Sequence, residues 1–181
     1  MIYMFLADGF EEIEALCPLD LLRRANLEIK TVSVTGRKTI VGSHGIAVEA
    51  DILPTSDISF ADAEMIIFPG GRAGAELMDA APITDKAIDA ALRNDAYICA
   101  ICAAPMILGK RGLLSGKRAV CYPGFEIHLG GATYCPDDGV VSDGKIITSR
   151  AMGSSFEFGF ALVSVMTSAQ TAATIKEQIH F

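Results

Sequence analysis

The stretch YICAICAAPMILGKRG, residues 97–112, decides how this chain is interpreted. An apolar, strand-like run meets Cys102, and a helix-like run follows without an ordinary turn residue between them. Small residues flank the cysteine in the pattern Ala100-x-Cys102-x-Ala104. A sharp strand-to-helix turn needs such residues because strand and helix approach each other closely there. The stretch is therefore either a nucleophile elbow that exposes the sulfur or a core segment with a buried structural thiol.

The helix expected from Ala103 onward has a direct chemical consequence. Its N-terminal amides and its dipole would point at the Cys102 sulfur and favour the thiolate. We therefore expect a reactive cysteine if the elbow is formed.

Short apolar or β-branched segments alternate with longer helical ones along the chain. This alternation predicts an α/β fold, a three-layer sandwich with a mostly parallel sheet. Residues 34–51 alternate and carry several glycines, which predicts a β-hairpin appendage. Pro82 suits a first helical turn, whereas Pro18 predicts a kink or a break in the first helix. The expected strands are Ile2–Ala7, Ile29–Val34, Met65–Phe68, Tyr97–Ile101, Ala119–Tyr122 and Lys145–Thr148, and the expected helices are Glu11–Arg24, Gly74–Asp79, Pro82–Arg93, Ala103–Arg111, Ser155–Ser168 and Gln170–Gln178.

The composition is that of a globular protein, with 181 residues of which 51% are hydrophobic and 20% charged. We expect one domain, residues 1–181. The net charge of −7 argues against a nucleic-acid surface. No apolar run approaches the roughly 20 residues of a membrane-spanning helix, and the N-terminus lacks the basic region of a signal peptide. Five cysteines, an odd number, predict reduced thiols in a cytoplasmic protein.

Cys99 and Cys102 have the Cys-x-x-Cys spacing of thioredoxin-like redox pairs. Cys99 falls inside the expected strand, so the two sulfurs should point to opposite faces of the sheet. Structural zinc needs four convergent ligands, and Cys121 and Cys135 do not form a second close pair. These arguments disfavour both a redox pair and a metal site.

Two further turns follow expected strands at the same edge of the sheet, where sites gather in such folds. In ADGFEEIEALCPLD, surface acids that complement the helix dipole would explain Glu11 and Glu12. A carboxylate that points into the crevice, Glu14 included, would instead be a candidate proton shuttle for the cysteine, and spacing alone does not select it. In IIFPGGRAG, Gly70 and Gly71 form either an oxyanion hole or a plain tight turn.

Neither turn carries a nucleotide motif. The G-x-G-x-x-G spacing and the Walker A lysine pattern are both absent, so no cofactor is expected. The histidines His44, His128 and His180 are not adjacent to Cys102 in sequence. We expect surface or structural roles for them, since a Cys–His dyad would require the fold to bring the two side chains together.

The segments DGFEEIEALCPLDLLRRA, IIFPGG, AICAAP and ITSRAMGSSFEFG closely resemble the ThiJ/PfpI family, in particular its Parkinsonism-associated deglycase branch. The resemblance covers nearly the whole chain and implies a flavodoxin-like, usually dimeric protein. It implies that Cys102 is the nucleophile and that Glu14 contacts its sulfur. It also implies that Gly71 and Ala103 supply backbone amides. Activities of the branch are a cofactor-independent glyoxalase reaction, deglycation, chaperone-like protection and oxidation sensing.

Three positions depart from the family pattern. Ala103 stands where the proteolytic branch has a histidine, so we do not expect a peptidase. Tyr122 stands where animal members carry a histidine, and His44 where many relatives carry an arginine. The last two residues are candidate contributors to the site and leave the general acid open.

Two functions follow from these observations. The first is an enzyme that converts small 2-oxoaldehydes such as methylglyoxal to 2-hydroxy acids through Cys102 and Glu14. The second is a non-enzymatic oxidative-stress sensor or chaperone-like protein whose Cys102 is oxidised to the sulfinate. We favour the enzyme because the crevice offers a carboxyl and oxyanion donors besides the thiol. The expected partners are a small-molecule carbonyl substrate and a second copy of the chain, without nucleic acid or membrane.

Overall fold

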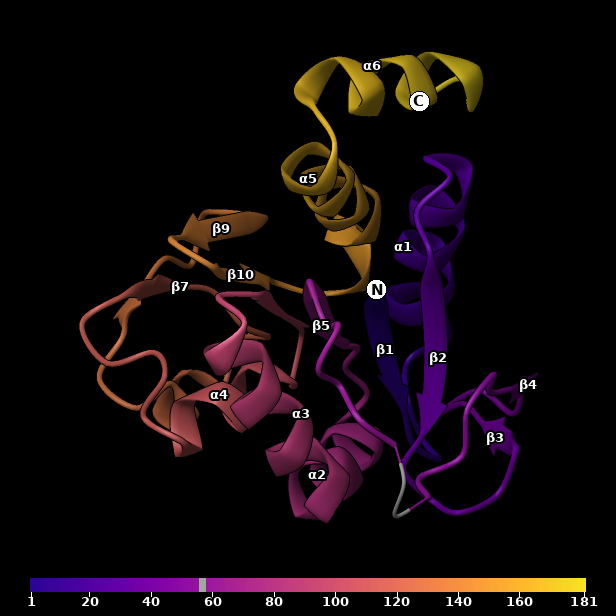
Figure 1. Cartoon of the computed structure of the whole chain (residues 1–181). Helices are drawn as coiled ribbons and strands as arrows, with labels where there is room; N and C mark the ends of the chain where they lie inside the picture. The colour runs from indigo at the N-terminus through magenta and orange to yellow at the C-terminus, as the bar shows by residue number, and fades with distance from the viewer. Residues whose placement is uncertain (56–57) are drawn as a thin grey trace.

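Alternating strands and helices build a three-layer α/β sandwich in the computed structural model, which describes residues 1–55 and 58–181 (Figure 1). Within these residues the central sheet has six strands. Neighbouring strands are parallel except for the last pair, which is antiparallel. The arrangement is flavodoxin-like, so the predicted fold class is confirmed. In their order across the sheet the strands are β2 (Ile29–Ser33), β1 (Ile2–Leu6), β5 (Met65–Phe68), β6 (Tyr97–Ile101), β10 (Ile146–Ser149) and β9 (Val140–Asp143).

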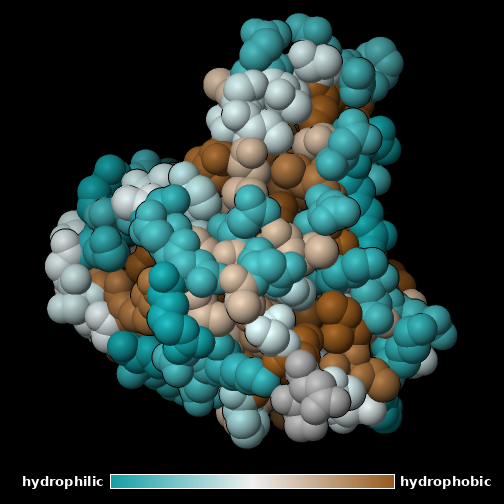
Figure 2. Space-filling model, viewed as in Figure 1, coloured by the Kyte–Doolittle hydropathy of each residue, from teal (hydrophilic) through white to brown (hydrophobic). Residues whose placement is uncertain are grey.

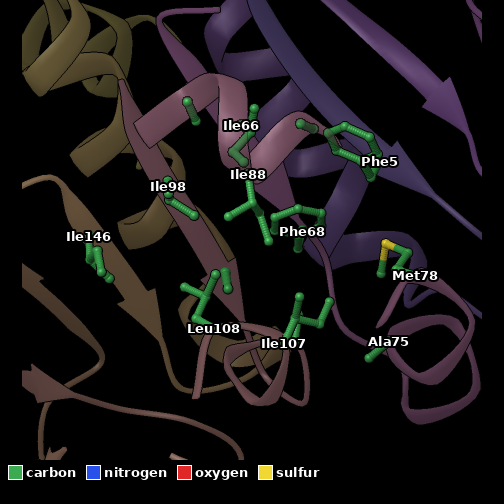
Figure 3. Close-up of a cluster of buried hydrophobic side chains, with 14 of the residues drawn as sticks. Phe5, Ile66, Phe68, Ala75, Met78, Ile88, Ile98, Ile107, Leu108 and Ile146 are labelled. Carbon is green, nitrogen blue, oxygen red and sulfur yellow. The ribbon is translucent and has the colours of Figure 1, made fainter. Parts of the chain in front are cut away.

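The inner strands are buried on both faces because their sequences are almost continuously apolar. In β1, Phe5 faces one helical layer and Met4 faces the other. Figure 3 shows the first of these two cores, where Phe5 stacks on Phe68 with ring centroids 5.1 Å apart. The helices of this layer are α2 (Arg72–Ala80), α3 (Pro82–Arg93) and α4 (Pro105–Lys110), and those on the other side are α1 (Glu12–Arg24), α5 (Ser155–Met166) and α6 (Ala169–Gln178).

The predicted helices are all present, with ends that differ by at most two residues from the prediction. The sequence predicted either a kink or a break at Pro18. A break is wrong, because α1 continues through this residue. Pro18 packs closely on Gly159 of α5, where an added Cβ would lie 3.2 Å from the proline Cα. This packing supports the helix although proline removes one backbone donor.

The predicted strand Ala119–Tyr122 is wrong. β7 covers only Arg118–Ala119 and pairs with β8 (Thr133–Tyr134) in a separate small sheet. The reason lies in the partners of the following amides. Val120 N–H donates to the Thr148 hydroxyl at 3.0 Å, and Tyr122 N–H donates to the carbonyl of Cys102 at 2.8 Å. The elements that the sequence did not predict are β8, β9 and the 3-10 helices η1 (Glu126–His128) and η2 (Met152–Ser154).

The predicted hairpin of residues 34–51 is confirmed. β3 (Thr39–Val41) pairs antiparallel with β4 (Ala47–Glu49) in a two-stranded sheet, at the lower right of Figure 1. The end of β3 next to the hairpin turn is bound to the loop after β1, because Asp8 Oδ1 accepts the N–H of Val41 at 2.9 Å. The hairpin therefore lies beside the carboxyl end of the first strand.

Hydrophilic side chains cover most of the face shown in Figure 2, with smaller hydrophobic areas between them. Within residues 1–55 and 58–181, none of the helices combines the length and the apolar character needed to cross a membrane.

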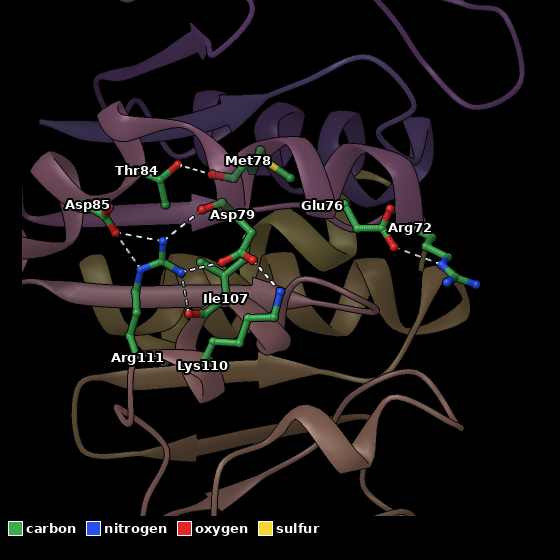
Figure 4. A network of polar contacts seen from close by, with 9 residues as sticks. All are labelled: Arg72, Glu76, Met78, Asp79, Thr84, Asp85, Ile107, Lys110 and Arg111. Carbon is green, nitrogen blue, oxygen red and sulfur yellow. Dashed lines mark hydrogen bonds and ion pairs between the residues drawn. The ribbon is translucent and has the colours of Figure 1, made fainter.

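A polar network joins the three helices on the Figure 3 side of the sheet, as Figure 4 shows. Arg111, at the end of α4, donates to Asp79 Oδ1 at 2.6 Å and to the Asp79 carbonyl at 3.0 Å. The same guanidinium donates to Asp85 at 2.8 Å, and Lys110 Nζ lies 2.5 Å from Asp79 Oδ2. Burial raises the pKa of Asp79, but these two cations outweigh it and the pKa is lowered. The network therefore fixes α4 against α2 and α3.

We predict that Arg111→Met lowers the free energy of unfolding by about 1–3 kcal/mol, because Asp79 loses a charged partner in a largely buried position. Arg72→Met is the matched control, since Arg72 pairs with Glu76 on an exposed helix surface. Its loss should stay below about 0.5 kcal/mol. Urea denaturation of both variants makes the comparison, and equal losses would contradict a bridging role for Arg111.

Candidate active site

Three loops meet at the carboxyl ends of the neighbouring strands β1, β5 and β6. They are the turn that leads into α1, the turn of residues 69–71, and the turn that begins at Cys102. The chain adds β2 on one side of β1 and β5 on the other, so the strand order reverses between β1 and β5. Open α/β sheets bind ligands at this kind of switch point.

Cys102 lies at a sharp elbow after β6. Its φ of 64° is in the left-handed region, which side chains other than glycine rarely adopt. Strand β10 and the loop after β7 hold it there, because its N–H donates to the Ser149 carbonyl at 2.9 Å and its carbonyl accepts the N–H of Tyr122 at 2.8 Å. The predicted elbow geometry is confirmed, and the residue is half-buried.

The predicted start of the following helix at Ala103 is wrong. Residues 102–104 form a turn, and α4 begins at Pro105, which suits the first helical position because it lacks an N–H. The amides of Gly71 and Ala103 nevertheless hydrogen-bond the Cys102 sulfur. Individual amides from two loops therefore face the thiol.

Of the three neighbouring acids, Glu14 is the one whose carboxyl hydrogen-bonds the Cys102 side chain. The residue is 1% exposed, in the first turn of α1. Its Oε2 also accepts the N–H of Gly70 at 3.0 Å. Burial raises the pKa of Glu14 to about 7, helped by the charge of Glu11 and opposed by the hydrogen bonds. The carboxyl therefore exchanges a proton near neutral pH.

The pKa of the Cys102 thiol is raised as well, first by burial and then by the charge and hydrogen bond of Glu14. The amides of Gly71 and Ala103 act in the opposite direction. The sequence predicted that a helix terminus favours the Cys102 thiolate, whereas the charge of an ionised Glu14 disfavours it. Once the carboxyl carries the proton, its charge is gone and it can donate to the sulfur. We therefore describe Cys102 and Glu14 as a pair that shares one proton.

Gly70 and Gly71 permit the close approach of the three loops. A Cβ on Gly70 would lie 2.4 Å from Glu14 Oε2 and 2.6 Å from the Cys102 Cβ. Gly71 has a φ of 80°, and a Cβ there would lie 2.3 Å from the Gly9 carbonyl oxygen. The pair is a tight turn that also aims amides at the two reactive side chains.

The interpretation of Glu12 as a surface acid is wrong, because the residue is 2% exposed. Its Oε1 accepts the N–H of His44 at 2.7 Å, and its Oε2 lies 2.9 Å from His44 Nδ1 and 3.2 Å from the Ser43 hydroxyl. Burial raises the pKa of Glu12, but hydrogen bonds led by His44 outweigh it and lower the pKa to about 2. Glu12 therefore anchors the hairpin tip, while Glu11 caps α1 by accepting the N–H of Glu14 at 2.8 Å.

The remaining candidates lie around this centre. The His44 side chain is 72% exposed and faces Glu12. Tyr122 meets Cys102 through its backbone, and its exposed ring lies edge-on to Phe125. His128 packs on Phe125 as well, and His180 follows the end of α6. In the described part of the chain no histidine hydrogen-bonds Cys102.

The fold and this site match a known family. The model described as the DJ-1/PfpI family matches residues 1–165, so the chain belongs to this family, as predicted. Protein DJ-1 homolog B of Arabidopsis thaliana is 34% identical over 94% of this chain and 39% of its own length. A protein of Pyrococcus abyssi named as a deglycase is 30% identical over 83% of this chain and 89% of its own.

Solved structures agree with this assignment. Oxidized DJ-1 of Toxoplasma gondii has a TM-score of 0.90 and 30% identity, covering 99% of this chain and 97% of that one. The chain therefore spans nearly all of this relative and less than half of the Arabidopsis protein.

We predict that Gly70→Ala lowers the free energy of unfolding by roughly 1–3 kcal/mol and changes the alkylation rate of Cys102, because the new methyl group displaces Glu14 or the thiol. Gly153→Ala is the control, since a Cβ at Gly153 meets nothing within 4 Å. Urea denaturation and mass spectrometry after iodoacetamide treatment measure both effects. Indistinguishable variants would contradict the close packing described for Gly70.

Proposed function

We propose that this protein is a cofactor-independent cysteine enzyme that converts small 2-oxoaldehydes, such as methylglyoxal, to 2-hydroxy acids. One observation carries the proposal: the buried Glu14 carboxyl hydrogen-bonds the Cys102 side chain, whose sulfur also accepts amides from two loops. Thiol, proton carrier and oxyanion donors thus lie together at the carboxyl ends of β1, β5 and β6. The Pyrococcus relative named as a deglycase supports carbonyl chemistry.

In the first step the Cys102 sulfur adds to the aldehyde carbon. A C–S bond forms, the thiol proton passes to the Glu14 carboxylate, and the carbonyl electron pair moves onto oxygen. The amides near Gly70, Gly71 and Ala103 offer hydrogen bonds to this developing charge. The oxygen then takes the proton back from Glu14, which gives a hemithioacetal and a carboxylate.

In the second step Glu14 removes the proton from the former aldehyde carbon and returns it to the neighbouring carbon. The hydroxyl proton on the first carbon's oxygen moves to the oxygen of the neighbouring carbon, so the first oxygen becomes the thioester carbonyl and the second the hydroxyl. The product is a thioester of Cys102 with the 2-hydroxy acid. Water hydrolyses the thioester, releases the acid and restores the thiol, so the overall reaction adds one water without net oxidation. A pKa of about 7 suits Glu14 to this work, because its acid and base forms are both populated near neutral pH.

The second candidate is an oxidation sensor. Cys102 is half-buried rather than inaccessible, and a protonated Glu14 would donate a hydrogen bond to a sulfinate at the same sulfur. The oxidized state named for the Toxoplasma relative favours this candidate.

We further propose a cytoplasmic homodimer built from one domain, residues 1–181. Support for the dimer comes from two exposed apolar side chains, Ile13 at the start of α1 and Ile46 on the hairpin tip. A hydrogen bond from the His44 N–H to Glu12 joins these two elements. Sedimentation velocity of the preparation used for turnover reports the mass, and a monomer would contradict the dimer.

The enzyme is tested by turnover of methylglyoxal without glutathione, followed as lactate. We expect lactate from the wild type, none from Cys102→Ser and a loss of about 100-fold or more from Glu14→Gln, which cannot carry the proton. Cys135→Ser is the matched control, because this half-buried thiol lies outside the three loops. Full activity in Cys102→Ser or Glu14→Gln would overturn the mechanism.

The same proteins distinguish the sensor. Mild peroxide treatment followed by mass spectrometry reports oxygen addition at each cysteine. Selective addition of two oxygens at Cys102, together with no aldehyde turnover by the wild type, would replace the enzyme with the sensor.

A further inference from the structure

We propose that Glu11, Glu12 and His44 form a binding site for a transition-metal dication, with Zn²⁺ as the reference ion. One ligand atom from each of the three side chains lies within 4.8 Å of the others. The cluster joins the start of α1 to the hairpin tip, so it exists only in the folded protein. The sequence argument against a metal site concerned cysteine ligands only, and none of these three residues is a cysteine.

The separation of two candidate ligand atoms suits an ion. His44 Nδ1 lies 2.9 Å from Glu12 Oε2. Zinc binds imidazole nitrogen and carboxylate oxygen at about 2.0–2.2 Å, so one ion can bind both atoms at a ligand–metal–ligand angle of roughly 90°. Without the ion the two atoms are at hydrogen-bond distance, and the ionised Glu12 carboxylate accepts a hydrogen bond when the imidazole carries its proton on Nδ1. Metal binding therefore exchanges that proton for the ion.

Glu11 provides the third ligand. Its Oε2 accepts the N–H of Glu14, which fixes the carboxylate at the end of α1. The carboxylate places one oxygen within 4.8 Å of the ligand atoms of Glu12 and His44. In the single chain the His44 side chain is 72% exposed, which gives an ion and its waters access from solvent. Three protein ligands and water would complete the coordination.

The ligands are held in place before the ion arrives. The Glu12 carboxylate accepts the His44 N–H and the Ser43 hydroxyl, and it is nearly inaccessible to solvent. Two carboxylates next to one imidazole also give the cluster a negative balance that attracts a dication. An imidazole with two carboxylates favours zinc and its neighbours over Mg²⁺ and Ca²⁺, which prefer sites made of oxygen alone.

The test titrates Zn²⁺ into Cys102→Ser protein by calorimetry, because the reactive thiol would otherwise compete for zinc. We expect one ion per chain. His44→Ala and Glu11→Gln in the same background should each weaken binding about tenfold or more. His128→Ala is the matched control, since this histidine lies on η1 beside Phe125, outside the cluster. Its affinity should equal that of the parent.

Two further measurements keep the result interpretable. Co²⁺ in place of Zn²⁺ should bind without a thiolate charge-transfer band, which separates the cluster from the remaining cysteines. In ¹⁵N spectra of the imidazoles, Zn²⁺ should shift the His44 resonances and leave His128 and His180 unchanged, which needs no variant that loosens the hairpin.

The proposal is overturned by unchanged affinity in His44→Ala, by a thiolate band with Co²⁺, or by shifts confined to His128 or His180. An absence of saturable binding up to millimolar Zn²⁺ would overturn it as well. Because binding is measured without substrate, none of these results bears on the proposed enzymatic reaction.

Discussion

The burial of one carboxyl group against one thiol is the constraint on which the site depends. Removing a carboxyl from water is unfavourable unless hydrogen bonds replace its hydration. Here Glu14 is 1% exposed and bonds both Cys102 and the amide of Gly70. Those contacts require a turn without side chains at Gly70 and a left-handed Cys102. The switch point of the sheet brings all three loops together, so the fold and the chemistry share the same few residues.

Two acids in the same helical turn show how strongly local partners decide their chemistry. Glu12 and Glu14 are both almost fully buried, yet the pKa of Glu12 falls to about 2 and that of Glu14 rises to about 7. Glu12 receives several donors from the hairpin, His44 first among them, and these stabilise its charge. Glu14 has fewer donors and a neighbouring thiol. One acid is therefore a permanent anion that holds the hairpin, and the other is suited to move a proton.

The sequence predicted those features that depend on local pattern. Continuous apolar runs indicated the inner strands, and the alanines around Cys102 indicated the elbow that the structure contains. The strand predicted at Ala119–Tyr122 is wrong because the amides of Val120 and Tyr122 bond Thr148 and Cys102, partners that are distant in sequence. The burial of Glu12 escaped prediction because the hairpin covers it only after folding. The choice of Glu14 among the acids came from family resemblance, since spacing did not distinguish them.

The most direct measurement is an NMR titration of the glutamate side-chain carboxyl carbons, with Glu12→Gln and Glu14→Gln used for assignment. We predict a midpoint of about 7 for Glu14 and of about 2 for Glu12 in the same protein. A Glu14 midpoint near its ordinary value of 4.5 would contradict the account, because the carboxyl would then be hydrated and would not share a proton with Cys102.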